Sequence, residues 1–385
     1  MSVKVQRMPR SIPFTEEHDM FRKMTADFYK NEVEPHMVEW EKEGQVSREV
    51  WEKAGALGLI CPNFPEKYGG AGADFLYNTI VIEESAKVRN SGFFLSLHAD
   101  VVAPYILEFG SEEQKQKYLP DIIAGKKILA ISMTEPGTGS DLANIQTRAV
   151  DKGDHYLLNG SKTFISNGHL ADINIVCART GEGQGGISLL IVESDWPGYE
   201  KGKKLEKVGL KAQDTAEIHF TDVKVPKENL LGKVNRGFRY LMQELQQERL
   251  VLAISNQVAA EMALDMTVQY VHERKAFGKK IGSFQNTRFK LADMLVEQEM
   301  SRAFVDQIIM AHNNGDKRMI QASMAKLNCS EMLNKHVNQC LQMFGGYGYM
   351  LEYPIARAYL DARIQTIYAG TSEIMKEIIS KAVGL

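Results

Sequence analysis

The spacing of hydrophobic and polar positions changes twice along the chain. From Thr15 to about Lys126, apolar residues recur at helical spacing, and the sequence Thr15-Glu-Glu-His predicts the start of the first helix. Across residues 129–225 the period falls to two, which predicts short antiparallel strands joined by turns rich in Gly, Asn and Asp. Helical spacing returns from about Phe238 to the end. The pattern predicts an α+β multi-domain fold with three parts: an N-terminal α-helical domain (residues 1–128), a middle β-sheet domain (129–236) and a C-terminal α-helical bundle domain (237–385).

The last part contains three long amphipathic segments that are expected to be helices: residues 240–276, 284–314 and 318–343. The sequence Asn313-Asn-Gly-Asp is expected to be the turn between the second and the third, which would then run antiparallel. In the middle part, Gly181-Glu-Gly-Gln-Gly-Gly matches the spacing of a dinucleotide-binding loop. That loop needs a helix after its glycines, whereas strand-like residues 187–192 follow here, so we expect a flexible turn.

Composition and charge exclude several classes of function. The 385 residues carry 46 Lys and Arg against 49 Asp and Glu, a net charge of −3, which gives no case for a nucleic-acid or anionic-membrane partner. No apolar run approaches the roughly 20 residues of a membrane span, and the segment from Met1 to Arg10 lacks the apolar region of a signal peptide. The four cysteines show no metal-like spacing, so we expect buried thiols, no metal site and a cytoplasmic location.

The sequence Ile131-Ser-Met-Thr-Glu-Pro-Gly-Thr-Gly-Ser-Asp follows an alternating run that is typical of a strand. Its glycines let a backbone approach a ligand closely, and hydroxyls stand at Thr134, Thr138 and Ser140. Such N–H and O–H donors suit a phosphate, a carbonyl or the edge of a flavin ring. On composition alone, an ordinary turn between strands is the commoner interpretation.

Two further stretches have residues suited to a large cofactor. In Lys162-Thr-Phe-Ile-Ser-Asn-Gly, strand alternation would place Phe164 and Ser166 on one face, where a ring and a hydroxyl could flank a flat heterocycle. The alternative is that Phe164 belongs to the core. In Arg274-Lys-Ala-Phe-Gly-Lys, at the end of a predicted helix, the arginine fork suits a pyrophosphate, although a plain surface arginine is the commoner interpretation of this pattern taken alone.

One acidic residue lies on an otherwise apolar helical stripe. Leu241, Leu245, Glu248 and Leu252 are spaced 4, 3 and 4 apart, so they share one face of a helix. Burial there would raise the pKa of the Glu248 carboxyl and make it a better base near neutral pH. The alternative is a solvated glutamate paired with a neighbouring arginine or lysine. Glu244 lies off the stripe and is expected to be solvated in this way.

Five stretches, residues 131–141, 162–168, 274–285, 342–348 and 368–373, occur in an order and at a spacing that resemble the acyl-CoA dehydrogenase family. The resemblance covers nearly the whole chain and is closest to the long-chain and isovaleryl branch. It implies a C-terminal four-helix bundle, bound FAD and the α,β-dehydrogenation of an acyl-CoA thioester. Phe and Ser stand here where medium-chain members carry Trp and Thr beside the flavin, and both functions are kept.

The resemblance assigns roles residue by residue. In the family, the aromatic position packs on the flavin and the hydroxyl position donates to flavin N5. Thr371 would contact the flavin of its own subunit. The FAD of a neighbouring subunit would be held by Arg274, Phe277, Gln285, Gln342 and Gly346, so a homotetramer is implied. The implied FAD-binding residues are Met133, Thr134, Gly139, Ser140, Phe164, Ser166, Arg274, Phe277, Gln285, Gln342, Gly346, Thr371 and Glu373. The implied substrate-binding residues are Ser140, Arg249, Tyr368 and Gly370.

The catalytic base is where this chain departs from most of the family. Most members carry a glutamate directly before the Gly-Thr of the last loop, and that position is Ala369 here. The sequence Gln247-Glu-Arg-Leu matches the motif in which long-chain and isovaleryl members carry the base on a helix. The resemblance therefore implies that Glu248 is the base. The backbone N–H of Ala369 and a ribityl hydroxyl of FAD would stabilise the enolate oxygen.

The resemblance also implies a partner and a substrate class. An electron-transferring flavoprotein would reoxidise the flavin, and the substrate would be a long-chain or branched acyl-CoA. Two alternatives remain open. One is an oxidase or monooxygenase of the same fold that reacts directly with oxygen. The other, suggested by Ala369 alone, is a relative that binds acyl-CoA without catalysis.

Overall fold

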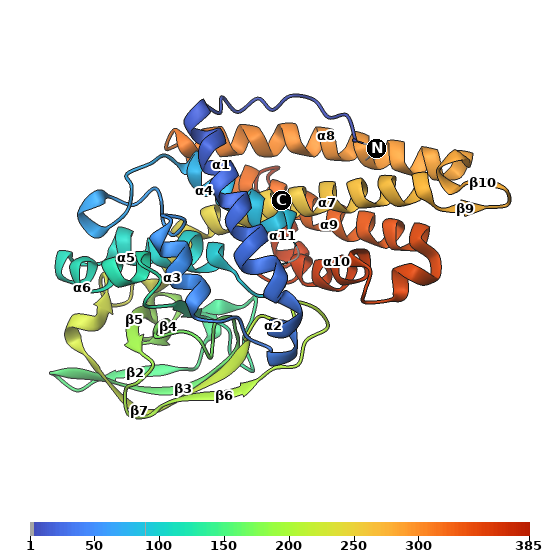
Figure 1. Cartoon of the computed structure of the whole chain (residues 1–385). Coiled ribbons are helices and arrows are strands. Elements are labelled where there is room, and N and C mark those ends of the chain that lie inside the picture. The colour runs from blue at the N-terminus through green and yellow to red at the C-terminus, as the bar shows by residue number, and fades with distance from the viewer. Residues whose placement is uncertain (1–3, 89) are drawn as a thin grey trace. The chain divides into compact units, whose positions relative to one another are not determined.

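The structure is a computed structural model that describes residues 4–88 and 90–385. The chain forms two compact units. One comprises the described residues of Met1–Tyr29, Thr79–Arg89 and Glu248–Leu385, and the other comprises Lys30–Asn78 and Asn90–Gln247. The first unit is helical, and the second contains the sheet together with shorter helices (Figure 1). Across the described residues, no helix combines the length and the hydropathy that a membrane crossing requires.

Long helices dominate the first unit. Helix α9 packs against α8, α10 and α11, and the loop Asn313-Asn-Gly-Asp joins α8 to α9 as predicted (Figure 1). Buried residues of α7, α8 and α9, among them Leu264, Met294 and Leu333, form one apolar core. The helices that contribute to this unit are α1 (Glu16–Phe28), α4 (Phe75–Lys87), α7 (Gly237–Glu273), α8 (Gln285–Asn313), α9 (Met319–Phe344), α10 (Pro354–Ala362) and α11 (Ser372–Lys381).

The predicted start of the first helix is confirmed. Thr15 is the N-cap of α1, and its hydroxyl accepts a hydrogen bond from the backbone N–H of His18. The His18 ring accepts in turn from the backbone N–H of Thr15, so two otherwise unpaired groups satisfy each other. The predicted boundary at the far end of α7 is wrong by three residues. The helix stops at Glu273, and Lys275–Ala276 (β9) pairs with Lys279–Lys280 (β10) in a small hairpin.

A buried ion network attaches the N-terminal segment to the helices of the first unit. The carboxylate of Glu83 lies 2.7 Å from the guanidinium of Arg10, 2.8 Å from that of Arg22 and 3.3 Å from that of Arg302. Burial alone would raise the pKa of Glu83, but the positive charges, that of Arg10 most of all, hold it below its ordinary value. Segments that are far apart in the sequence are therefore joined through one carboxylate.

The second unit is built on a mixed sheet that has eight strands in the described residues. Seven of them follow the order β6-β7-β3-β2-β4-β5-β8, and β1 pairs with β4. The strands are β1 (Leu129–Ser132), β2 (Arg148–Asp151), β3 (His155–Ile165), β4 (Ile173–Arg179), β5 (Ile187–Glu193), β6 (Tyr199–Lys204), β7 (Ala216–Pro226) and β8 (Leu230–Leu231). The helices are α2 (Met37–Glu43), α3 (Glu49–Ala56), α5 (Ala103–Phe109) and α6 (Glu112–Ile123), with a π-helical turn at Leu97–Val102.

Most strand pairs are antiparallel, as predicted, but β1 and β4 run parallel, and so does the single pairing of β2 with β4 at Arg148 and Arg179. A parallel pair needs a long connection, and the 40 residues between β1 and β4 (133–172) supply it with β2 and β3. The Gly181–Gly186 stretch ends in a short 3-10 turn (Gln184–Gly186) and leads directly into β5. A strand and not an α-helix therefore follows the glycines, which confirms the rejection of a dinucleotide-binding loop.

Candidate active site

The loop after β1 is a tight turn held against the neighbouring strand. The backbone groups of Glu135 and Thr138 bond each other at 2.8 and 3.0 Å, so the two residues between them form its tip. The N–H of Thr163 on β3 donates to the carbonyl of Thr134 at 3.0 Å. The hydroxyl of Thr138 is turned inward and donates to the carbonyl of Asn144, whereas Ser140 is exposed. Of the predicted hydroxyl donors, Thr138 is therefore already used within the loop.

A buried ion pair fixes the shape of this loop. Nζ of Lys162 on β3 lies 2.9 Å from Oε1 of Glu135 and donates to the carbonyl of Met133 at 3.0 Å. The Glu135 carboxylate also accepts from the backbone N–H groups of Gln146 at 2.6 Å and Thr147 at 2.9 Å. Burial alone would raise the pKa of Glu135, but the Lys162 charge brings it below its ordinary value. Met133 and Thr134 therefore occupy a rigid backbone.

Sequence interpretation gave no role to Glu135 or Lys162, yet the signal was present for the lysine. Strand alternation places Lys162 on the same face of β3 as Tyr156 and Leu158, and both of these are buried. A lysine on the buried face of a strand needs an anionic partner. Glu135, at the turn after β1, is that partner.

The glycines of the loop are not explained by the packing of this chain. A Cβ atom at Gly137 or at Gly139 would meet nothing within 4 Å, and neither residue has a positive φ. Both residues are exposed. A side chain at either position would therefore be tolerated by the chain itself. Close approach of a ligand to the backbone is the remaining reason for a glycine.

The structure corrects the expected arrangement of Phe164 and Ser166. Phe164 has a φ of +59° and the register of β3 against β7 shifts between Lys162 and Ile165. The strand ends at Ile165, so Ser166 lies in the following turn and simple alternation does not relate it to Phe164. The Phe164 side chain is 67% exposed, which excludes the interpretation as a core residue. An exposed ring on a strained backbone is typical of a ligand contact.

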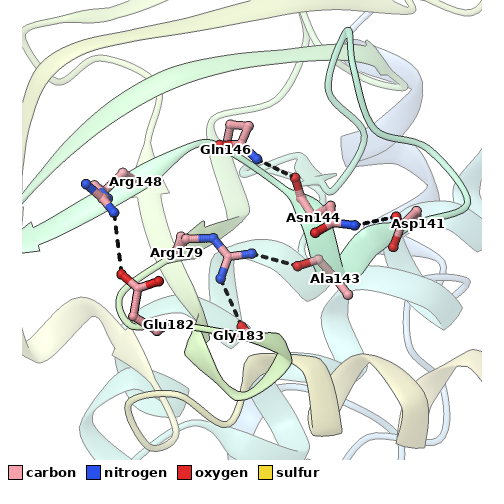
Figure 2. A pocket seen from close by; sticks show the side chains of 8 residues that line it. All are labelled: Asp141, Ala143, Asn144, Gln146, Arg148, Arg179, Glu182 and Gly183. Carbon is pink, nitrogen blue, oxygen red and sulfur yellow. Dashed lines mark hydrogen bonds and ion pairs between the residues drawn. The ribbon is translucent and has the colours of Figure 1, made fainter.

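A polar hollow lies beside the loop, on the same unit (Figure 2). Arg179 donates to the carbonyls of Ala143 at 2.6 Å and Gly183 at 2.9 Å, so its charge serves to fix the walls. Arg148 faces Glu182 across the hollow at 3.9 Å, and both side chains are exposed. The hollow is lined by Asp141, Ala143, Asn144, Gln146, Arg148, Arg179, Glu182 and Gly183.

The helical unit contains Glu248, the predicted base. Glu248 is 5% exposed, as expected from its stripe, and Arg249 is 3% exposed. Glu244 is also buried, at 4% exposure, so the expectation that it is solvated is wrong. Leu245, on the predicted apolar stripe, is only partly buried. A helix that is covered on more than one side has no single buried stripe. The apolar periodicity therefore does not predict the burial of Glu244.

Arg249 connects α7 to α9. Its guanidinium donates to the hydroxyl of Ser323 at 3.1 Å. Burial lowers the pKa of Arg249, and the charge of Glu248 opposes that shift. Within the described residues, Nε of Arg249 is buried and has no hydrogen-bond partner. A buried donor of this kind is costly, so it is a candidate contact for a polar ligand atom.

The last loop forms a sharp turn before α11. Ala369 has a φ of +49° and Gly370 has a φ of +91°, so two successive residues are left-handed. Thr371 then caps α11, because its hydroxyl accepts from the N–H of Ile374 at 3.3 Å. The hydroxyl of Tyr368 donates to Gln365 at 2.9 Å. Ala369 and Gly370 are both partly buried, and Glu373 is an exposed residue of the first turn of α11.

A third group of predicted residues lies around the β9–β10 hairpin. Phe277 has a φ of +52° at the hairpin tip and is 94% exposed. The guanidinium of Arg274 lies 5.5 Å from the ring centre of Tyr347, which follows Gly346 directly. The two stretches that were expected to bind a cofactor together are therefore adjacent. Gln285 begins α8 and Gln342 lies near the end of α9, and both are exposed.

Comparison with protein families gives matches over almost the whole chain. The family described as "Acyl-CoA dehydrogenase, N-terminal domain" matches residues 15–126. "Acyl-CoA dehydrogenase, middle domain" matches residues 130–223, and "Acyl-CoA dehydrogenase, C-terminal domain" matches residues 235–384. The three matches follow one another in the order in which the helical, sheet and helical segments occur.

Individual proteins are similar over nearly their full length. The mitochondrial long-chain specific acyl-CoA dehydrogenase of Sus scrofa is 50% identical over 96% of this chain and 87% of its own. The Caffeyl-CoA reductase-Etf complex subunit CarC of Acetobacterium woodii is 40% identical over 95% of this chain and 98% of its own. The crystal structure of an acyl-CoA dehydrogenase from Geobacillus kaustophilus has a TM-score of 0.95 at 50% identity, and covers 97% of this chain and 99% of its own.

Proposed function

Since this chain belongs to the acyl-CoA dehydrogenase family, we propose that it converts a long-chain or branched acyl-CoA into the trans-2-enoyl-CoA with Glu248 as the general base. The protein is an oxidoreductase of this family and uses FAD. The observation that carries the proposal is the burial of the Glu248 carboxylate in the same unit as the Ala369 turn, whose own side chain cannot take a proton.

The residues present fit FAD. The open space at Gly137 and Gly139 and the exposed ring of Phe164 are features that a flat cofactor would use, and the chain's own packing does not account for them. When bound, FAD supplies the ring that accepts a hydride from the β-carbon of the substrate. On the sheet unit we assign FAD binding to Met133, Thr134, Gly139, Ser140, Phe164 and Ser166. On the helical unit we assign it to Arg274, Phe277, Gln285, Gln342, Gly346, Thr371 and Glu373.

Glu248 takes the proton from the α-carbon. That proton is weakly acidic, so the base must be held close to it and must be ionised before it acts. The negative charge of Glu248 raises the pKa of the Arg249 guanidinium, so the two charged groups lie close enough to attract each other. The buried Nε of Arg249 is available to a polar atom of the substrate, in keeping with the predicted substrate-binding role.

The backbone of Ala369 stabilises the charge that develops on the thioester oxygen. Its N–H group does not depend on the side chain, so an alanine at this position keeps the donor that a glutamate would have. Ala369 and Gly370 both have left-handed backbone conformations. This conformation is strained, and an unconstrained loop would not keep it. Tyr368 and Gly370 border this position in sequence, and Ser140 supplies an exposed hydroxyl on the sheet unit.

The substrate class and the partner are inferred from relatives. The Sus scrofa protein is long-chain specific by name, which supports a long acyl chain, and the Acetobacterium woodii protein belongs by name to an Etf complex. We infer that an electron-transferring flavoprotein accepts the electrons. The exposed residues of the Arg274 hairpin, Gln285 and Gln342 support the predicted sharing of FAD between subunits of a homotetramer.

Anaerobic titration with acyl-CoA thioesters tests the reaction class. Purified flavoprotein is mixed with straight chains of increasing length and with methyl-branched chains, and the flavin absorbance is followed. Bleaching with formation of the 2-enoyl-CoA supports the proposal, and the chain that bleaches fastest identifies the substrate. Binding without bleaching by any thioester would contradict it. Rapid reoxidation by air with release of peroxide would indicate an oxidase instead.

A further inference from the structure

Lys326 on α9 is a buried lysine to which neither the family matches nor the sequence motifs give a role. Its side chain is fully buried, among neighbours such as Ala322, Ala325 and Cys329 that are also fully buried. A buried ammonium group is costly unless it is hydrogen-bonded. Its Nζ atom donates to the carbonyl oxygen of Gly370 at 2.6 Å, a short, charge-assisted hydrogen bond to a residue 44 positions away in the chain.

One face of helix α9 contacts both the segment that carries the proposed base and the turn that carries the proposed backbone donor. Ser323 and Lys326 are three residues apart, so they are neighbours on the helix surface. Ser323 accepts from Arg249, which is adjacent to Glu248, and Lys326 donates to Gly370, which is adjacent to Ala369. One turn of α9 therefore connects the segment that carries the base with the segment that carries the backbone donor.

The segment that Lys326 holds would not keep its shape unaided. A left-handed backbone is strained at a residue with a Cβ, and Ala369 adopts it at a φ of +49°. Gly370 follows at +91°, where a Cβ would lie 2.6 Å from Cε of Met375. Strain of this kind persists only where the surroundings oppose relaxation. The hydrogen bond from Lys326 is the charged contact that opposes it.

The charges around Lys326 come from three helices. Its pKa is lowered from the ordinary value to about 8, by burial most of all and then by the positive charge of Arg249 on α7. Glu331 on α9 and Glu373 on α11 raise it, but by less. The ammonium form is therefore the main species near neutral pH, and it is lost as the pH rises through about 8.

We propose that Lys326 is a positioning residue for the dehydrogenation: its hydrogen bond to the Gly370 carbonyl holds the Ala369–Gly370 turn so that the Ala369 N–H faces the thioester oxygen. This inference rests on the function proposed above. Lys326 does not touch the reacting atoms, and it acts through the backbone of the turn. A donor displaced by about 1 Å costs up to about a hundredfold in rate.

The test is a comparison of Lys326→Met and Lys326→Gln with the wild-type flavoprotein. Methionine has similar length but no donor, whereas glutamine keeps an N–H donor that can reach toward Gly370. Lys335→Met is the matched control, because Lys335 lies on the same helix, is half exposed and pairs with Glu297. Melting temperature and FAD content are measured first for each variant, and rates are expressed per bound flavin.

Anaerobic flavin reduction is then followed by stopped flow from pH 6 to 9.5, with substrate deuterated at the α-carbon as well as unlabelled. We expect Lys326→Met to lower the limiting rate about tenfold to a hundredfold. We also expect a larger isotope effect, because proton removal becomes harder. The wild-type decline near pH 8 should be absent in Lys326→Met, and Lys326→Gln should recover part of the rate.

A Lys326→Met protein with the wild-type rate, isotope effect and pH profile per bound flavin would overturn the proposal. So would an equal loss in Lys326→Met and Lys326→Gln with an unchanged isotope effect, because that pattern describes a structural defect. The base assignment is judged separately, from Glu248→Gln. If that variant reacts normally while Lys326→Met fails as described, the base is wrong and the positioning role stands. If none of the acyl-CoA thioesters bleaches the flavin of the wild-type protein, both proposals fail.

Discussion

Nζ of Lys162 lies 2.9 Å from Oε1 of Glu135, and both side chains are buried. The pair joins β3 to the loop that follows β1, and it holds the carbonyl of Met133 through the same ammonium group. Neither residue is among those assigned to FAD, yet the backbone that they fix carries Met133 and Thr134. The pair is therefore a support for the cofactor loop.

Removal of the lysine should destabilise the sheet unit. Lys162→Met leaves the Glu135 carboxylate buried without its cation, and breaking a buried pair in this way costs about 3–5 kcal/mol. Chemical denaturation of the FAD-free protein measures the loss. Adding Glu135→Gln to Lys162→Met should restore part of the stability, because the uncompensated charge is then gone. A double variant that is less stable than Lys162→Met would contradict this explanation.

The glycines of the cofactor loop should matter for FAD and not for folding. We expect Gly139→Ala to change the unfolding free energy of the FAD-free protein by less than about 0.5 kcal/mol, because the new Cβ meets no atom of the chain. We expect it to weaken FAD binding about tenfold or more, because the added methyl group would occupy space where the cofactor approaches the backbone closely. Denaturation and flavin titration separate the two effects.

Gly160→Ala is the contrasting control for this prediction. Gly160 has a φ of +148°, and a Cβ there would lie 2.6 Å from Oγ1 of Thr147. We therefore expect this variant to be strongly destabilised even without FAD. A Gly139→Ala protein that binds FAD with wild-type affinity would show that the cofactor does not approach the loop closely.

Asp100 makes stability depend on pH in a direction opposite to that of most carboxylates. The residue lies on the π-helical turn, and burial raises its pKa to about 7, although a hydrogen bond from Asn78 at 2.6 Å lowers it in part. The folded state therefore binds more protons than the unfolded state between about pH 4 and 7. Stability from this group is present at low pH and is lost as the pH rises through that window.

Asp100→Asn should remove this cost. Asparagine keeps an acceptor for Asn78 and has no charge to bury, so the variant should be more stable than wild type at pH 8 by a few kcal/mol, at about 1.4 kcal/mol for each unit of pKa difference. The gain should shrink toward zero as the pH approaches 4. Melting temperatures at a series of pH values measure it. An equal change at pH 4 and pH 8 would show that the effect is not one of titration.

The sequence was sufficient to predict the order of helical, strand and helical segments, because period and capping are local signals. Thr15 capped the first helix as predicted, and the glycine stretch that begins at Gly181 led into a strand. Features that depend on distant pairing were not accessible in this way. The parallel pairing of Leu129 with Ile173 in β1 and β4 joins residues 44 apart, and no local pattern records it.

The site was predictable where a motif carried it and unpredictable where packing decided. The apolar spacing and the motif together predicted Glu248 and its burial. The same spacing predicted that Glu244 is exposed to solvent, whereas Glu244 is buried. Strand alternation failed at Phe164, because a single positive φ breaks the period of two. Lys326 was missed because one lysine on a helix is usually exposed, even though Ala322 and Cys329 mark its face as buried.

The central claim is that Glu248 is the base, and single-turnover flavin reduction by Glu248→Gln tests it most directly. Glutamine keeps the shape of the side chain but cannot take a proton. Glu244→Gln is the matched control, since Glu244 is an equally buried glutamate one turn earlier on α7. With the best acyl-CoA under anaerobic conditions, we predict that Glu248→Gln binds substrate but bleaches about 10²–10⁴-fold more slowly, while Glu244→Gln stays close to wild type. Bleaching of Glu248→Gln at the wild-type rate would contradict the account.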